Sequence, residues 1–335
     1  METSAVPGWS RGDRAEQGDG VNGDDALAPP WGWFWAKTGA GGAYLPLLRH
    51  LEDVAAVARR LWDVALTDRQ RAWFAAGFGL DETDTRRWIS FLAASHDVGK
   101  ANRCFQELVP SLAQRLLPKH LRAARQDRLP GHDTVSGAIL LRWLTEQMGM
   151  SLPVAERLVA TFSGHHSVPK ARGQIRAGRR APTQWRSVQD ELADSLARRL
   201  GVDAILQPKR LDAPTVLATA GLISVADWIA SDPERFPVTD GPRRTSEELA
   251  RDAVHPSSWA PRPRPDAKDP EEIFEFALRA SQRAAAEAVA AVTGEKFLLL
   301  IEDRPGSGKT EAAFIAALQG FIDGCRGIYV GMPTQ

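Results

Sequence analysis

The chain has 335 residues with 42 basic and 42 acidic side chains, so its formal net charge is zero. A balanced charge excludes a general polycation, and any surface that binds nucleic acid must be local. The hydrophobic fraction of 43% and the charged fraction of 25% are typical of a soluble globular protein. The two cysteines, Cys104 and Cys325, exclude a disulfide framework and indicate a reducing, cytoplasmic setting. We find no apolar run long enough to span a bilayer, so we expect no membrane partner.

The first segments of the chain differ in composition. Residues 1–30 are rich in Gly, Asp, Ala and Pro, which predicts a disordered tail. Aromatic residues crowd positions 31–35, and we interpret them as an apolar plug in preference to a binding surface. A helix is expected over 46–65, where apolar residues recur at helical spacing. His50 lies at the inner edge of this stripe, although a single inward histidine is usually only a hydrogen-bonded core residue.

Residues 95–100, at the end of the helix expected over 84–95, have the sequence SHDVGK and carry side chains that could support chemistry. His96 and Asp97 offer an imidazole and a carboxylate within one turn, and both groups bind divalent metals. A carboxylate can also bridge two ions. Gly99 lets the backbone leave the helix by a tight path. Lys100 then brings a positive charge close to where an anionic substrate would lie.

Further helices are predicted over 103–125, from 132 onward, and over 154–162, 187–200 and 213–231. His132 opens one of these helices. The adjacent His165 and His166 follow the helix at 154–162, in a turn where both rings can point into one pocket. Asp227 lies within the strongly apolar helix at 213–231, where a carboxylate is costly unless it is paired or bound to a metal.

Residues 169–186 form a basic loop with six lysines and arginines and no acidic residue. Such a loop is often only a solvated surface. Beside a pocket that processes phosphates, it would be suited to guiding a nucleic-acid strand.

Five histidines and two aspartates lie on inward helix faces or at helix ends, and an all-helical bundle can bring such residues together. Seven nitrogen and oxygen ligands are too many for one ion and suit two. A pair of divalent ions stabilises an in-line displacement at a phosphodiester. The seven candidate metal ligands are His50, His96, Asp97, His132, His165, His166 and Asp227.

The order of these residues resembles that of the HD phosphohydrolase superfamily, and more specifically the HD nuclease domain of the CRISPR-associated type I nuclease-helicases. That pattern has a histidine on the first helix, then His-Asp-x-Gly-Lys, a single histidine, a His-His pair and a late aspartate. The matching motifs cover about 40–235: His50, Ser95–Lys100 with Phe105-Gln106, Gly131-His132, Gly164-His165-His166 and Ala226-Asp227-Trp228.

The resemblance implies a metal-dependent nuclease in which Asp97 bridges two ions and Lys100 neutralises charge in the transition state. One ion would be bound by His50, His96, Asp97 and Asp227. The other would be bound by Asp97, His132, His165 and His166. Because imidazole ligands favour transition metals, we expect manganese, iron, cobalt or nickel in preference to magnesium.

The C-terminal part begins with a Pro-rich segment, 236–270, which predicts a linker. A helix is expected over 271–291 and an apolar strand over 297–301, followed by the loop RPGSGKT at 304–310 and a helix over 311–320. A second strand is expected over 327–331. A glycine-rich loop between a buried strand and a helix is the context of a Walker A motif. We therefore expect ATP with magnesium to bind at Gly306, Ser307, Gly308, Lys309 and Thr310.

This loop resembles that of superfamily 2 helicases, although Asp303 stands where those proteins usually have a small residue. Residues 332–335 resemble the next helicase motif, and the later motifs are absent. The resemblance implies a truncated helicase region, from which we expect neither ATPase nor helicase activity.

We therefore predict a mainly α protein, with an HD-type helical bundle followed by the truncated start of an α/β RecA-like domain. The expected divisions are a tail at 1–30, the HD domain at 31–235, a linker at 236–270 and the incomplete RecA-like domain at 271–335. The expected function is cleavage of single-stranded DNA in CRISPR antiviral interference, with an RNA-guided surveillance complex as partner. Two alternatives stay open: an HD phosphohydrolase acting on small nucleotides, and an inactive remnant that only binds a partner complex.

Overall fold

The computed structural model describes residues 31–124, 131–163, 175, 181–261, 270–292 and 298–322. The predicted tail at 1–30, the His165-His166 pair, the strand at 327–331 and the motif at 332–335 lie outside these residues. The chain divides into two compact units, 1–259 and 260–335, which are described separately.

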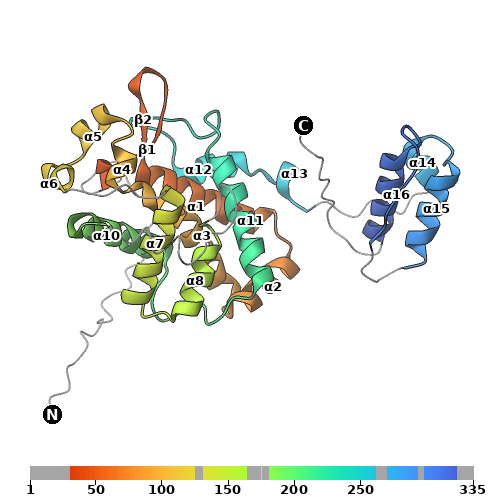
Figure 1. The fold of residues 1–335 in the computed structure, drawn as a ribbon, viewed down its shortest axis with the longest axis horizontal. Coiled ribbons are helices and arrows are strands. Elements are labelled where there is room, and N and C mark those ends of the chain that lie inside the picture. The colour runs from red at the N-terminus through yellow and green to blue at the C-terminus, as the bar shows by residue number, and fades with distance from the viewer. Residues whose placement is uncertain are drawn as a thin grey trace, which may run out of the picture. The chain divides into compact units, whose positions relative to one another are not determined.

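The first unit is a helical domain built around α1 (Leu47–Val64), which confirms the helix expected over 46–65. Its apolar stripe packs against α3 (Glu82–Ser95), α11 (Ala213–Ala230) and α12 (Ser246–Ala253). Figure 1 shows α1 crossing this unit with α3, α7 and α11 around it. Because both flanks of α1 are covered, almost every residue of its first three turns is buried.

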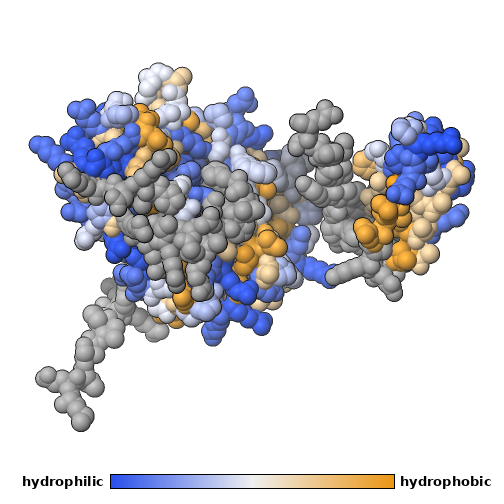
Figure 2. Space-filling view, in the orientation of Figure 1, coloured by the Kyte–Doolittle hydropathy of each residue, from blue (hydrophilic) through white to orange (hydrophobic). Residues whose placement is uncertain are grey.

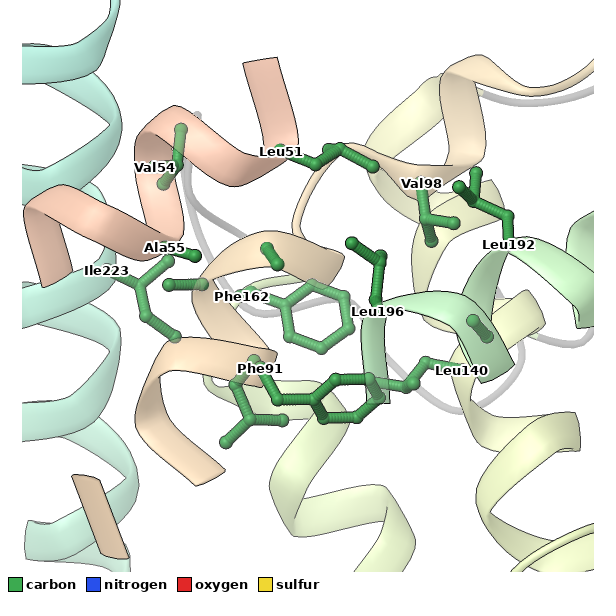
Figure 3. Close-up of a cluster of buried hydrophobic side chains, with 14 of the residues drawn as sticks. Leu51, Val54, Ala55, Phe91, Val98, Leu140, Phe162, Leu192, Leu196 and Ile223 are labelled. Atoms are coloured by element: carbon green, nitrogen blue, oxygen red, sulfur yellow. The ribbon is translucent and has the colours of Figure 1, made fainter. Parts of the chain in front are cut away.

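Three more predicted helices are confirmed as α7 (His132–Glu146), α8 (Leu152–Ala160) and α10 (Thr183–Leu200). The helix α2 (Asp68–Phe78) was not predicted, although Thr67 caps it in a capping box with Gln70. Much of the core between these helices is apolar, as Figure 3 shows for Leu51, Phe91 and Phe162. Close packing of this core fixes where each helix end lies.

A two-stranded antiparallel hairpin, β1 (Trp35–Thr38) and β2 (Tyr44–Pro46), precedes α1 and was not predicted. Strands this short carry too few residues for an alternating pattern to be visible. The short 3-10 helix η2 (Trp31–Trp33) comes before it. Phe34 is buried and its ring lies 5.8 Å from that of Trp185, which agrees with the apolar plug interpretation.

The helix predicted over 103–125 is wrong, because the chain forms three short helices there. These are α4 (Arg103–Gln106), α5 (Pro110–Leu116) and α6 (Lys119–Ala123). Pro110 and Pro118 explain the breaks, since a proline disfavours the helical conformation of the residue before it and cannot donate a backbone hydrogen bond.

The segment 236–259, which we predicted as part of a linker, instead packs on the helical domain as α12 and α13 (Pro256–Trp259). Asp53, fully buried on α1, accepts hydrogen bonds from Arg243 Nη2 and Ser246 Oγ, both at 2.7 Å. Prolines stop helices without preventing the chain between them from packing, so composition alone was misleading.

The second unit contains α14 (Pro270–Phe274), α15 (Ala280–Ala290) and α16 (Lys309–Ile322). The single helix predicted over 271–291 is wrong, because Glu275 adopts a positive φ of 55° and separates two helices. The strand predicted over 297–301 is not formed at 298–301, where Leu298 is 96% exposed. A lone apolar strand needs partner strands and a covering layer, and no strand is present among the described residues of this unit.

By length and composition alone, α11 is the one helix among the described residues that is long and apolar enough to cross a membrane. This corrects the expectation that no apolar run reaches that length. One face of α11 packs on α1 and α3, while Leu217 and Trp228 are 65% and 69% exposed. Figure 2 shows hydrophobic side chains on the surface over this helix. One such helix is weak evidence for a membrane span, since a core helix meets the same criteria.

The contact of Asp53 with Arg243 generates a stability prediction. Asp53→Ala is expected to lower the free energy of unfolding by about 3–5 kcal/mol, because it leaves a buried guanidinium without its counter-ion. Chemical denaturation followed by circular dichroism measures this change. Asp252→Ala is the matched control, since it removes an ion pair with Arg244 in which both side chains are more than half exposed. Equal effects of the two substitutions would contradict the prediction.

Candidate metal centre

Five of the seven predicted metal ligands come together inside the helical domain. His50 projects from α1, His96 and Asp97 end α3, His132 opens α7 and Asp227 projects from α11. His50 and His96 are fully buried, and Asp97 is 3% exposed. Four elements distant in sequence therefore converge on one buried polar cluster.

Asp97 lies at the middle of this cluster, and its two oxygens face different partners. Oδ2 is 3.1 Å from His50 Nε2, 3.4 Å from His96 Nε2 and 2.7 Å from Lys100 Nζ. Oδ1 is 3.2 Å from His132 Nε2. A carboxylate with histidines on both sides has the arrangement expected of a ligand that bridges two ions.

Asp227 completes a group of three possible ligands on the Oδ2 side. Its Oδ1 is 3.4 Å from His96 Nε2 and 3.9 Å from His50 Nε2. The ligand atoms of these three residues all lie within 4.8 Å of one another, and all three residues are buried. Two imidazole nitrogens and a carboxylate oxygen fit a divalent cation, and imidazole favours a transition metal.

The backbone at the end of α3 orients the ring of His96. Its Nδ1 is 2.8 Å from the carbonyl oxygen of Ala93, so Nδ1–H donates there and Nε2 faces the two carboxylates. Metal-binding histidines usually make such a second hydrogen bond, which fixes the tautomer and the direction of the ring.

Gly99 has a different role from the one we predicted. Its φ is not positive; instead, a Cβ atom there would lie 2.1 Å from the backbone oxygen of His132 and 2.4 Å from the amide of Ser136. The Gly99 amide also donates to Ser136 Oγ at 2.8 Å. Glycine is therefore required because α7 approaches the motif closely, and this approach brings His132 to Asp97.

Charge within the cluster is strongly coupled. Burial lowers the pKa of His50 to about 3, so its imidazole is neutral. Burial also acts to lower the pKa of His96, but the carboxylates of Asp97 and Asp227 outweigh it and raise this pKa to about 10. Burial acts to raise the pKa of Asp97, yet Lys100 and His96 hold it well below its usual range. In the absence of a metal, a proton on His96 and the charge of Lys100 balance the acids.

The amino group of Lys100 contacts Asp97 directly, and its role in neutralising charge in the transition state stays a prediction. It is 7% exposed, and Nζ also donates to the carbonyl oxygen of Ala36 at 3.3 Å. Gln106, fully buried, fastens this region: its Nε2 donates to the carbonyls of Lys100 at 2.9 Å and Trp35 at 3.0 Å. The first strand and the motif are thereby held together.

Two residues beside the cluster were missed in the sequence. Lys37 Nζ on β1 donates to Ser231 Oγ at 2.6 Å, and Ser231 Oγ donates to Asp227 Oδ1 at 2.9 Å. Burial lowers the pKa of Lys37. Ser231 lies one helical turn after Asp227, and this spacing could have indicated the contact from the sequence. Lys37 could not have been found in this way, because the strand that carries it is too short to show a pattern.

The remaining predicted site residues stand as follows. His165, His166 and most of the basic loop lie outside the described residues; Arg186 is exposed on α10. In the second unit, Gly306 and Gly308 adopt positive φ angles of 75° and 91° just before α16. Lys309 Nζ donates to the carbonyls of Asp303 and Arg304 at 2.7 and 2.8 Å. A pocket of about 530 Å³ adjoins Gly306, Gly308, Lys309 and Thr310.

The helical bundle and its histidine–aspartate cluster define a metal-binding domain of the HD class. The chain belongs to the Cas3 HD domain family, whose model matches residues 35–236. It is 33% identical over 322 residues to the CRISPR-associated endonuclease/helicase Cas3 of Thermus thermophilus, an alignment that covers 90% of this chain and 34% of that protein. The chain thus spans about a third of the length of the curated relatives it matches.

Solved structures give the same result. The Thermus thermophilus Cas3 HD domain, crystallised in the presence of Ni²⁺, is 31% identical with a TM-score of 0.50 and covers 66% of this chain and 87% of its own. A chain of a CRISPR RNA-guided surveillance complex in a pre-nicking state is 26% identical with a TM-score of 0.52, covering 87% of this chain and 35% of that one.

The protonation of His96 generates a prediction about metal binding. A metal needs the lone pair on Nε2, so binding must release about one proton from a group whose pKa is about 10. The apparent affinity for manganese is therefore expected to rise about tenfold per pH unit between pH 6.5 and 8.5. Titration calorimetry in two buffers of different ionisation enthalpy measures the proton release. An affinity that stays flat over this range would contradict the prediction.

Proposed function

We propose that the helical domain is a metal-dependent nuclease that cleaves single-stranded DNA in CRISPR interference. The observation that carries this proposal is the position of Asp97, whose two oxygens face separate histidines within a buried cluster. Few requirements other than two neighbouring ions explain so costly an arrangement of buried polar groups.

We assign His50, His96, Asp97 and Asp227 to the first ion, and Asp97, His132, His165 and His166 to the second. Two divalent ions held there would polarise a phosphodiester and activate water for in-line displacement. Lys100 keeps Asp97 ionised and limits the net negative charge of the cluster. Lys37, on the partly exposed side, keeps Asp227 oriented through Ser231.

The relatives support the choice of substrate class and partner. The relative from Thermus thermophilus is named an endonuclease/helicase, and its HD domain was crystallised with Ni²⁺, an ion that imidazole ligands favour. Another similar chain belongs to an RNA-guided surveillance complex before nicking. We therefore propose such a complex as the partner that delivers single-stranded DNA. The basic loop at 169–186 would then direct the DNA strand toward the metal cluster.

For the second unit we propose the start of a RecA-like domain, with Gly306, Ser307, Gly308, Lys309 and Thr310 as the loop that binds ATP and magnesium. The positive φ angles of Gly306 and Gly308 support this, because they turn the backbone toward the pocket beside the start of α16.

The metal assignment predicts the content of ions in substituted proteins. Asp97→Ala is expected to remove both ions, because it deletes the shared ligand, whereas His132→Ala is expected to remove chiefly one. Inductively coupled plasma mass spectrometry of protein loaded with manganese or nickel measures the ratio of metal to chain. His120→Ala is the control, since His120 packs against Trp33 away from the cluster. A single ion in fully loaded unsubstituted protein would contradict the two-ion site.

The function predicts cleavage that does not depend on nucleotide. A labelled single strand incubated with manganese is expected to be degraded equally with and without ATP, because the cluster contains everything the hydrolysis requires. His96→Ala is expected to reduce the rate at least a hundredfold, since it removes a ligand beside Asp97. Gel electrophoresis of the products follows the reaction.

The same assay separates the alternatives. Hydrolysis of mononucleotides or cyclic nucleotides with intact oligonucleotides would favour a small-nucleotide phosphohydrolase. Cleavage that survives His96→Ala would move the chemistry away from this cluster. Absence of all hydrolysis in protein that retains two ions would favour a remnant that only binds a partner.

A further inference from the structure

A second concave site lies in the helical domain, lined by residues that do not belong to the metal cluster. It is a pocket of about 410 Å³ between α1, α3, α10 and the segment that leads into α12. Five arginines line it, and two glutamates, Glu52 and Glu247, are the acidic residues of its wall. The arginines are Arg49, Arg59, Arg199, Arg243 and Arg244.

Four of the five guanidinium groups have acidic partners. Arg59 pairs with Glu247, and Arg199 Nη1 lies 3.0 Å from Glu52 Oε1. Arg243 Nη2 lies 2.7 Å from Asp53 Oδ1, and Arg244 Nη1 lies 2.7 Å from Asp252 Oδ2. The pairs of Arg59, Arg199 and Arg243 join α12 and α10 to α1, so part of this charge has a structural role.

Arg49 is the exception, and it is buried. The residue is 8% exposed, and its Nη1 donates to the carbonyl of Gly241 at 2.8 Å. No carboxylate lies within ion-pair distance of it among the described residues. Arg243 Nη1 is also buried and lacks a hydrogen-bond partner in that part of the chain. Arg49, which has no described carboxylate in range, and Arg243 Nη1, whose neighbour Nη2 pairs with Asp53, therefore leave guanidinium donors that an anion in the pocket could use.

The other walls select what kind of anion fits. Ala55, Ala94, Leu196 and Leu200 make one side apolar. The volume lies within the range of small-ligand pockets and exceeds what an inorganic oxyanion fills.

We propose that this pocket binds a small phosphate ester of mononucleotide size, with its phosphate at Arg49 and Arg243 and its apolar body against Leu196 and Leu200. Guanidinium groups match the phosphate geometry through paired hydrogen bonds. The site shares no lining residue with the metal cluster, so the inference does not rest on the proposed nuclease function.

Titration calorimetry in the presence of a metal chelator tests this inference on the whole chain. The probes are the four common ribonucleoside 5′-monophosphates, adenosine, inorganic phosphate and a single-stranded oligonucleotide. At least one monophosphate is expected to bind at least tenfold more tightly than phosphate and adenosine. Its affinity should fall as salt is raised, because the contact is ionic.

Substitutions locate the site. Arg49→Ala is expected to weaken binding of the monophosphate at least tenfold, and Arg49→Lys by less, since lysine keeps the charge but not the fork of donors. Arg199→Ala, at a partly exposed wall residue, supplies a second variant if Arg49→Ala does not fold in a thermal melt. Arg251→Ala on the exposed face of α12 is the matched control and should leave affinity unchanged.

Four results would overturn the inference. These are the absence of saturable binding of every monophosphate, an affinity for inorganic phosphate equal to theirs, binding by the oligonucleotide alone, and binding that His96→Ala abolishes while both pocket variants retain it. The last result would assign the ligand to the metal cluster.

Discussion

The structure depends on one buried carboxylate and the groups that keep it charged. Asp97 is ionised inside the core because an ammonium and three imidazoles surround it. Burying this carboxylate without them would cost several kcal/mol. The helices that supply these groups must therefore keep fixed positions relative to Asp97. The apolar core fixes the helix ends, and the helix ends bring the counter-charges to Asp97. Packing and electrostatics therefore specify the same arrangement.

The sequence predicted the parts of this arrangement that follow from periodicity and motif order. The stripe around His50 predicted α1, and the order of the His and Asp motifs predicted which helix ends would meet. It also indicated Asp227, because a carboxylate in so apolar a helix requires a partner. These signals are local, and the convergence of the five described ligands was the step that depended on the resemblance.

What was missed required knowledge of packing. The contribution of Lys37 depends on a strand of four residues, too short for a pattern to be read. The segment 236–259 was predicted as a linker from its prolines, yet Asp53 on α1 holds its Arg243 and Ser246. The apolar run at 298–301 was predicted as a strand, but a strand needs neighbours that composition does not supply. His165 and His166 lie outside the described residues, so their place in the site stays a prediction.

The contact at Gly99 has a consequence for the precision of the proposed site. Because backbone meets backbone there, the separation between the motif and α7 is set by atoms that have no rotamers. Side chains elsewhere in the core can exchange or relax, and such changes would alter how firmly each ion is held. The gap that Asp97 spans toward His132 would remain nearly constant, as if set by a rigid spacer. In the proposed two-ion site, substitutions elsewhere in the core would therefore leave the distance between the two ions largely unchanged.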